Sequence, residues 1–112
     1  MFSSVDKVTY KASTELTISV GAVVTVTQAF HTIDTNADGA SDDLETIAGL
    51  VAGTWYTFMA AHTARSIVFK TGSDNIVCNG AADLTMDSTN DIVKGFSPDG
   101  TNIFCYLAVQ GG

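Results

Sequence analysis

Positive charge is scarce in this sequence. Its 112 residues include five Lys and Arg against twelve Asp and Glu, which gives a formal net charge of −7. Proteins bind nucleic-acid phosphates and anionic lipid headgroups through Lys and Arg, so this balance excludes nucleic acid and charged membrane surfaces as expected partners. No apolar run approaches the ~18 residues of a membrane-spanning helix. The first residues lack the basic start and apolar stretch of a secretory signal, so we expect neither a membrane segment nor secretion.

Cysteine and proline are nearly absent as well, with two residues and one residue. Because no secretion signal is expected, Cys78 and Cys105 are predicted to be reduced core residues rather than a disulfide. A chain of this length can bury roughly 65% of its surface without a covalent staple. The composition, 46% hydrophobic and 15% charged, excludes a disordered chain. The length predicts one domain.

What the sequence does have is alternation. Apolar and polar residues alternate with a period close to two, which is typical of half-buried β-strands, and Gly, Asp and Ser separate the alternating runs. Strands are predicted at residues 14–20, 23–33, 54–61, 65–71, 91–96 and 102–109, with short ones at Ile76–Cys78 and Leu84–Met86. The pattern predicts an all-β fold, a single-domain antiparallel sandwich, jelly-roll-like fold or small barrel of about eight short strands. Residues 1–13 are interpreted as an N-terminal arm and residues 14–112 as the single β domain.

The number of residues in the loop between the first two predicted strands decides whether their apolar side chains share one face of the sheet. A two-residue loop would place the apolar sets of the two strands on opposite faces of the sheet. A three-residue loop, Gly21–Val23, pairs Val20 with Val24 and keeps both sets on one face. We therefore expect an antiparallel hairpin between these strands.

The last predicted strand is apolar on both faces. One face carries Ile103, Cys105, Leu107 and Val109, and the other carries Phe104, Tyr106 and Ala108. A strand with two apolar faces is usually covered on both sides. Either a second subunit covers the face of Phe104, or the strand lies at the centre of a thick single core.

Residues 34–45 form an acidic loop that fits a calcium-binding pattern. Its oxygen-bearing positions are Asp34, Asn36, Asp38, Asp42 and Glu45, with a glycine where the sharp turn falls. The preceding segment alternates as a strand, and no long amphipathic helix follows, which argues against an EF-hand. The alternative is an Asx-rich turn whose side chains bond their own backbone. The pattern leaves both interpretations open, and we assign no metal site.

Few residues suggest catalysis. His31 paired with Asp34 would have the components of a general base, but the sequence has no nucleophile motif of a known type. His31 and His62 are both expected near strand ends as ordinary polar residues. Arg65, the only arginine, is expected to bond a carboxylate or carbonyl. We therefore expect no enzyme, no catalytic residue and no cofactor.

An aromatic cluster follows Gly49 and Gly53. Trp55, Tyr56 and Phe58 would make a carbohydrate-stacking platform if they shared an exposed face. Aromatic residues on a strand more often belong to the core. The sequence leaves both possibilities open.

Four segments in order carry a resemblance to a known family. They are Val24–Thr35, Ser41–Ile47, Ala64–Lys70 followed by Asn75-Ile76, and Asp91-Ile92 followed by a D-G turn and an aromatic-bearing last strand. Together they resemble a β-structured module of tailed-bacteriophage virion proteins, found in head decoration (cement) proteins, head fibres and tail appendages. The resemblance spans roughly residues 15–108. The family's last hairpin often carries Trp where this chain has Phe104.

The resemblance implies a structural role without catalytic residues. It implies a capsid decoration protein on the virion surface, made in the host cytoplasm, that binds the major capsid protein and stabilises the assembled head as a homotrimer. A closed threefold interface would cover the second apolar face of the last strand. The expected interface residues are Phe104, Tyr106 and Ala108, with Phe2, Val5, Val8 and Tyr10 from the arm. The alternative is a tail or head-fibre module that binds a host-surface glycan.

Overall fold

The computed structural model describes residues 11–111, which form eleven short strands and two 3-10 turns. The strands are β1 (Thr14–Thr17), β2 (Val23–Thr25), β3 (Phe30–Asp34), β4 (Ser41–Leu44), β5 (Thr46–Ala48), β6 (Thr54–Ala60), β7 (Ser66–Phe69), β8 (Ile76–Cys78), β9 (Leu84–Met86), β10 (Ile92–Ser97) and β11 (Ile103–Val109). The 3-10 turns are η1 (Asn36–Asp38) and η2 (Asn79–Ala81). The predicted all-β single domain is confirmed. Leu44 and Ile47, whose spacing of three suits either a helical turn or a short strand, both lie in strands.

The strands form mixed sheets. One sheet has the order β1-β3-β6-β10-β11-β8, a second pairs β2 with β5, and a third has the order β4-β7-β9. Five of the eight strand pairings are parallel and three are antiparallel. The expectation of a wholly antiparallel arrangement is therefore wrong, although the strands predicted at residues 91–96 and 102–109 do pair antiparallel with each other.

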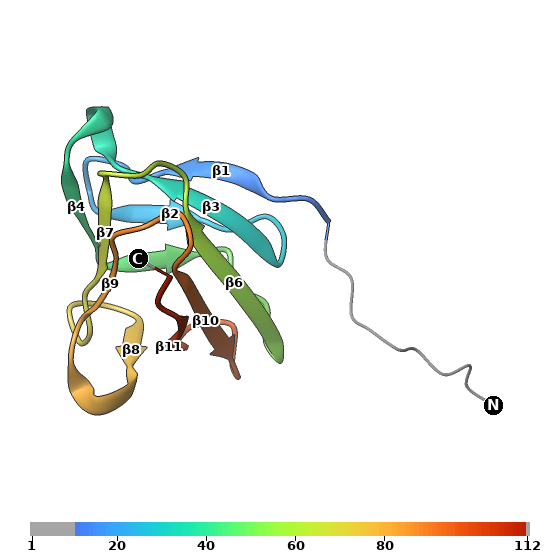
Figure 1. Ribbon diagram of the computed structural model, residues 1–112. Coiled ribbons are helices and arrows are strands. Elements are labelled where there is room, and N and C mark those ends of the chain that lie inside the picture. The colour runs from blue at the N-terminus through green and yellow to red at the C-terminus, as the bar shows by residue number, and fades with distance from the viewer. Residues whose placement is uncertain (1–10, 112) are drawn as a thin grey trace.

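The parallel pairings stack successive turns of the chain. Thr14 lies opposite His31, Ser41 opposite Ser66, and Ile76 opposite Ile103. The paired residues are therefore about 17 to 27 positions apart, a separation typical of coils that stack on one another in solenoids. Figure 1 shows β1 and β3 running side by side, with β6 and β10 continuing the same sheet. The stacking brings together residues that are distant in sequence.

The predicted hairpin at residues 14–33 is wrong. β1 ends at Thr17 and pairs with β3, whereas β2 pairs with β5. Val20 is 95% exposed in a turn where the N–H of Ala22 donates to the carbonyl of Ser19. Alternation determines which face of a sheet a residue occupies, but it does not determine which strand lies beside it. The loop length therefore predicted a pairing of neighbouring strands that does not form.

A buried histidine, His31, stabilises the bend in the chain that separates β2 from β3. Nε2 of His31 accepts the backbone N–H groups of Thr27 (3.0 Å) and Gln28 (3.3 Å), which lie where the chain bends. Nδ1 lies 3.1 Å from the carbonyl oxygen of Thr14, so it carries the proton and donates to it. His31 is fully buried. This side chain serves the fold, and the hypothesis that it acts with Asp34 as a general base is not supported by its contacts.

The core lies on the inner face of the large sheet. Tyr56, Phe58 and Ala60 of β6 are buried together, as their alternation predicts. The Phe58 ring lies 5.9 Å from that of Phe69 on β7 and therefore joins two sheets. Gly95 of β10 faces the same side, and a Cβ there would lie 2.6 Å from Cδ1 of a buried isoleucine. The sheet can pack closely at this point because position 95 has no side chain.

The two cysteines are free and buried, as predicted, and they lie opposite each other on β8 and β11. Burial raises the pKa of the Cys105 thiol to about 12 and also raises the pKa of Cys78. We expect the native protein to react with Ellman's reagent at pH 8 at least about tenfold more slowly than the urea-unfolded chain, because the thiols react only after local opening. Rapid labelling of either thiol in the native state would contradict this burial.

Candidate functional site

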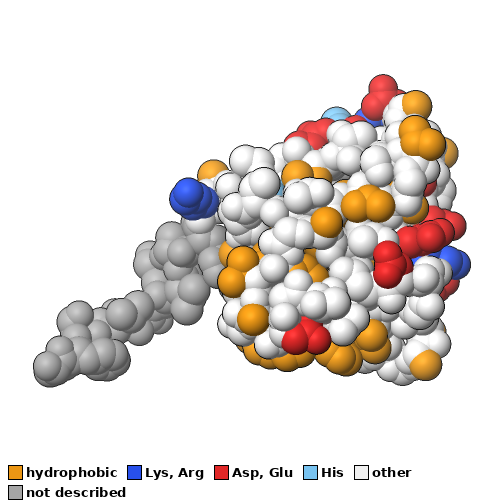
Figure 2. Space-filling view, turned by 180° about the vertical axis from the view of Figure 1, so that it is seen from behind, with side chains coloured by type: hydrophobic (Ala, Val, Ile, Leu, Met, Phe, Trp, Pro, Cys, Tyr) orange, Lys and Arg blue, Asp and Glu red, His pale blue; other side chains and the backbone are white. Residues whose placement is uncertain are grey.

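The outer face of the large sheet exposes aromatic and aliphatic side chains. Trp55 is 47% exposed on β6, Phe104 49% and Tyr106 37% on β11, and Val77 40% on β8. Figure 2 shows hydrophobic side chains over much of one side of the molecule, several of them along its lower edge. We call Trp55, Val77, Phe96, Phe104, Tyr106 and Ala108 the aromatic face. Single exposed apolar residues are ordinary, whereas a contiguous set on rigid strands is typical of a contact surface.

Strand register aligns part of the aromatic face in one row. Phe96 of β10 lies opposite Trp55 on one side and opposite Phe104 on the other. Phe104 in turn lies opposite Val77 of β8, so the row crosses four strands. The rings of Trp55 and Phe96 are 5.0 Å apart, and Tyr106 meets Trp55 edge-on at 6.4 Å. These contacts hold the rings in place before any partner arrives.

The structure decides two sequence interpretations on this sheet. Phe104, Tyr106 and Ala108 are exposed, so the thick-core explanation of the last strand is wrong for this single chain. Tyr56 and Phe58 are buried, so they do not share an exposed platform with Trp55, which lies on the opposite face. The other expected interface residues, Phe2, Val5, Val8 and Tyr10, lie outside the described residues.

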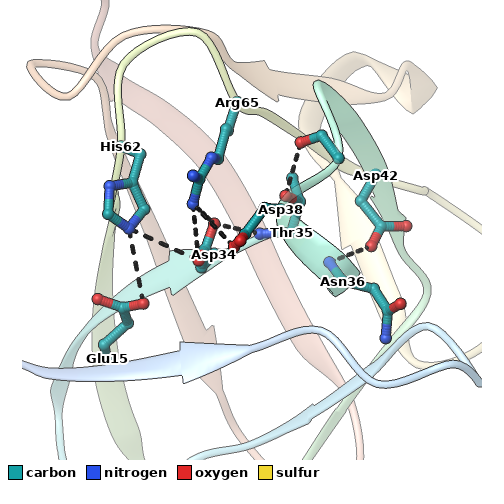
Figure 3. Close-up of polar contacts among 9 residues, drawn as sticks. Glu15, Asp34, Thr35, Asn36, Asp38, Asp42, His62 and Arg65 are labelled. Atoms are coloured by element: carbon teal, nitrogen blue, oxygen red, sulfur yellow. Dashed lines mark hydrogen bonds and ion pairs between the residues drawn. The ribbon is translucent and has the colours of Figure 1, made fainter.

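A polar cluster lies where β3 ends. Asp34 at the end of β3 meets His62 and Arg65 from the connection between β6 and β7, and Glu15 from β1 (Figure 3). Nε2 of His62 is 3.6 Å from Oδ2 of Asp34 and 3.8 Å from Oε2 of Glu15. Nη1 of Arg65 donates to both oxygens of Asp34 at 3.1 Å. The expectation that Arg65 bonds a carboxylate is confirmed.

Asp34 is the buried centre of this cluster. Its side chain is 8% exposed, whereas the side chains of Glu15 and His62 are nearly half exposed. Burial raises the pKa of Asp34, but the hydrogen bonds from Arg65 and from the backbone N–H of Thr35 outweigh burial and hold the pKa below its usual range. Asp34 is therefore a carboxylate at neutral pH and is held on two sides by donors.

The acidic loop folds as a turn that uses its own oxygen atoms. Oδ2 of Asp42 accepts the N–H of Asn36 at 2.8 Å, and the Asn36 amide donates to the Ile18 carbonyl at 3.1 Å. Oδ1 of Asp38 accepts from Arg65 at 3.1 Å. The Asp42 contact lies within the loop, as the Asx-rich turn predicts, whereas Asn36 and Asp38 bond residues outside it. Oxygen atoms of Asp38 and Asp42 from the calcium pattern are therefore used by donors of the fold.

Sequence reasoning missed Glu15 and gave His62 no role. Glu15 lies in an alternating polar position, where an exposed carboxylate is the ordinary expectation. Only the parallel pairing of β1 with β3, in which Glu15 lies opposite Thr32, brings it near Asp34. No local sequence signal contains this information, because the partner strand is chosen by the whole stack.

An open pocket of about 230 Å³ lies beside the start of β6. It is lined by Val26, Thr27, Gln28, Ala29, Gly49, Val51, Thr54 and Tyr56. The volume is below the range of about 300–1,000 Å³ typical of small-molecule sites. No ionisable group other than the Tyr56 phenol lines it, and that hydroxyl accepts the N–H of Val51 at 2.8 Å. The pocket offers little chemistry.

Comparison with known proteins identifies no relative: no family model, no curated protein and no solved structure matches this chain. Among the described residues, no helix has the length and apolar character to cross a membrane.

Proposed function

We propose that this protein is a capsid decoration protein of a tailed bacteriophage, which binds the assembled head as a homotrimer and stabilises it. The aromatic face is the single observation that carries the proposal. Interface cores are enriched in Trp, Tyr and Phe, and the residues that dominate binding energy lie near the interface centre. Trp55, Phe96, Phe104 and Tyr106, which stand on the three adjacent strands β6, β10 and β11, have this composition.

The rigid setting of the face supports a structural role. Its rings stand on strands paired on both sides, so little ordering of the backbone is needed when a partner binds. Each Å² of apolar surface that binding removes from water contributes roughly 25 cal/mol to the binding free energy, before the entropy lost on association is subtracted. A protein that binds only the assembled shell stabilises that shell by mass action. The role requires neither a cofactor nor catalysis.

The trimer and the arm complete the proposal. A closed threefold assembly buries part of the aromatic face between copies and leaves the remainder for the major capsid protein. In this proposal residues 1–13 contact the shell or a neighbouring subunit, and the protein lies on the capsid surface. The finer fold assignment, a sandwich, jelly roll or small barrel, stays a prediction.

The test uses heads of the encoding phage that lack this protein. Labelled wild-type protein is expected to sediment with the heads, and the double variant Trp55→Ser/Phe104→Ser is expected to bind at least about tenfold more weakly. Val20→Ser is the matched control, because Val20 is 95% exposed and lies in the turn before β2. Equal binding by both variants, or no binding by the wild type, would refute the proposed role of the face.

The oligomeric state is measured separately by light scattering at micromolar concentration. A mass near three times 11.7 kDa is expected. A monomer would contradict the trimer.

A glycan-binding module of a tail or head fibre is the second candidate. Trp55 favours it, because this exposed indole is supported by the rings of Phe96 and Tyr106. Binding on a glycan array that is lost in Trp55→Ala would favour this function. No binding on the array, together with attachment to heads, would favour the decoration protein.

A further inference from the structure

We propose that Glu15, Asp34 and His62 form a binding site for a divalent transition-metal ion of the zinc type. The three side chains each offer one ligand atom, and these atoms lie within 4.8 Å of one another. Among residues 11–111 they are the one group in which three such ligands converge. The site is separate from the aromatic face and does not depend on the function proposed for it.

The spacing of the ligand atoms fits an ion. Ligands at about 2.0–2.2 Å from a tetrahedral zinc lie roughly 3.4 Å apart. Nε2 of His62 is 3.6 Å from the Asp34 oxygen and 3.8 Å from the Glu15 oxygen, which is longer than a hydrogen bond. Figure 3 shows the imidazole directed into the gap between the two carboxylates. A small inward movement of the exposed Glu15 and His62 side chains would complete three metal bonds.

Asp34 is prepared to act as a ligand. Its Oδ1 accepts the N–H of Thr35 at 2.8 Å, and Arg65 donates to both of its oxygens. Donors of this kind orient ligating carboxylates in metal proteins. Oδ2, the oxygen nearer to His62, is presented toward the other two ligands.

Charge favours a cation despite the guanidinium nearby. The cluster contains three carboxylates, those of Glu15, Asp34 and Asp38, against one guanidinium, that of Arg65. Asp38 lies 3.1 Å from Arg65 and offsets its charge. The remaining negative charge attracts a divalent ion, since opposite charges at these distances interact favourably even near a protein surface.

The ligand types select the ion. One imidazole nitrogen with two carboxylate oxygens suits zinc and its neighbours, whereas calcium and magnesium take oxygen ligands. The exposed side of the group leaves a fourth position for water. A bound ion would join β1, an edge strand, to the end of β3 and to the connection after β6.

The experiment titrates the full chain, first freed of metal by a chelator, with zinc chloride in a calorimeter. One zinc ion per chain is expected, with a higher melting temperature in zinc, because binding to the folded state stabilises it. Cobalt(II) bound in place of zinc is expected to give the visible absorption band of a four-coordinate ion. Absence of a saturable zinc signal would overturn the proposal.

Two variants and one control locate the ion. Glu15→Gln and His62→Ala are each expected to weaken zinc binding at least about tenfold, because each removes a direct ligand. Glu45→Gln is the matched control: it changes a carboxylate of the acidic loop outside the group and is expected to bind zinc like the wild type. Circular dichroism checks that each variant is folded.

Wild-type affinity in His62→Ala would place the ion elsewhere and overturn the proposal. Calcium binding that is lost in Glu45→Gln, with no response to zinc, would also overturn it.

Discussion

Replacing Phe58 with alanine is expected to lower the free energy of unfolding by about 3–5 kcal/mol, because the change leaves a cavity in a close-packed core. Phe58 is fully buried, and its ring lies 6.5 Å from that of Tyr56 and 5.9 Å from that of Phe69. It therefore joins the large sheet to β7. Urea unfolding monitored by circular dichroism measures the change.

The matched control is Phe104→Ala. Both positions hold phenylalanine on the same sheet, but Phe104 is 49% exposed on the outer face. Its replacement is expected to change the stability by less than about 1 kcal/mol. Similar losses at the two positions would mean that the inner and outer faces of the sheet are assigned incorrectly.

Replacing Asp34 with asparagine is expected to lower stability by about 2–4 kcal/mol at pH 7, measured with a chelator present. The substitution removes the buried one of the two carboxylates that bond Arg65, and it places an amide N–H₂ near donors that now face a carboxylate. Breaking the buried half of this ion pair is costly, because the amide cannot accept from every donor and only the exposed Asp38 remains to compensate the guanidinium charge.

The same substitution is expected to change the response to acid. The folded-state pKa of Asp34 lies below its ordinary value. Its contribution to stability is therefore fully present above the unfolded pKa of about 3.9 and is lost as the pH falls through the lower folded pKa. Urea midpoints at pH 7, 5 and 3 should fall less steeply below pH 4 in Asp34→Asn than in the wild type.

Asp38→Asn is the control for this ion pair. Asp38 also bonds Arg65 at 3.1 Å, but its side chain is 73% exposed. Exposed ion pairs contribute little, so only a small change is expected. Equal effects at positions 34 and 38 would contradict the central place of Asp34 in the cluster.

Local pattern predicted the buried face of several strands correctly. Tyr56, Phe58 and Ala60 are buried together, as are Ile67 and Phe69. Side chains alternate across any β-strand whatever its partner, so this information is contained in a few consecutive residues. The turn-forming use of the acidic loop was one of two possibilities open from the sequence, because the same oxygens suit a calcium ion and a backbone N–H.

The candidate sites were predicted unevenly. Phe104, Tyr106 and Ala108 were singled out, because a strand with two apolar faces is visible in the sequence. Phe96 was missed as their neighbour, because it joins them only through the β10–β11 register. Of the metal-binding group, Asp34 was noted only for other patterns, His62 was given no role and Glu15 was missed. The three residues lie far apart in the sequence and share no motif.

By itself, the sequence determined the all-β class, the single domain and the side of β6 and of β7 that faces the core, and it favoured free cysteines in the core. Composition and alternation are local properties, and they are enough for these conclusions. Only the tertiary structure decided that β1 pairs with β3 in parallel, and therefore that Glu15 lies beside Asp34 and His62. The physical reason is that parallel pairing joins residues through the packing of successive coils. The energy of that packing comes from contacts along the whole chain, so no single segment of the sequence contains it.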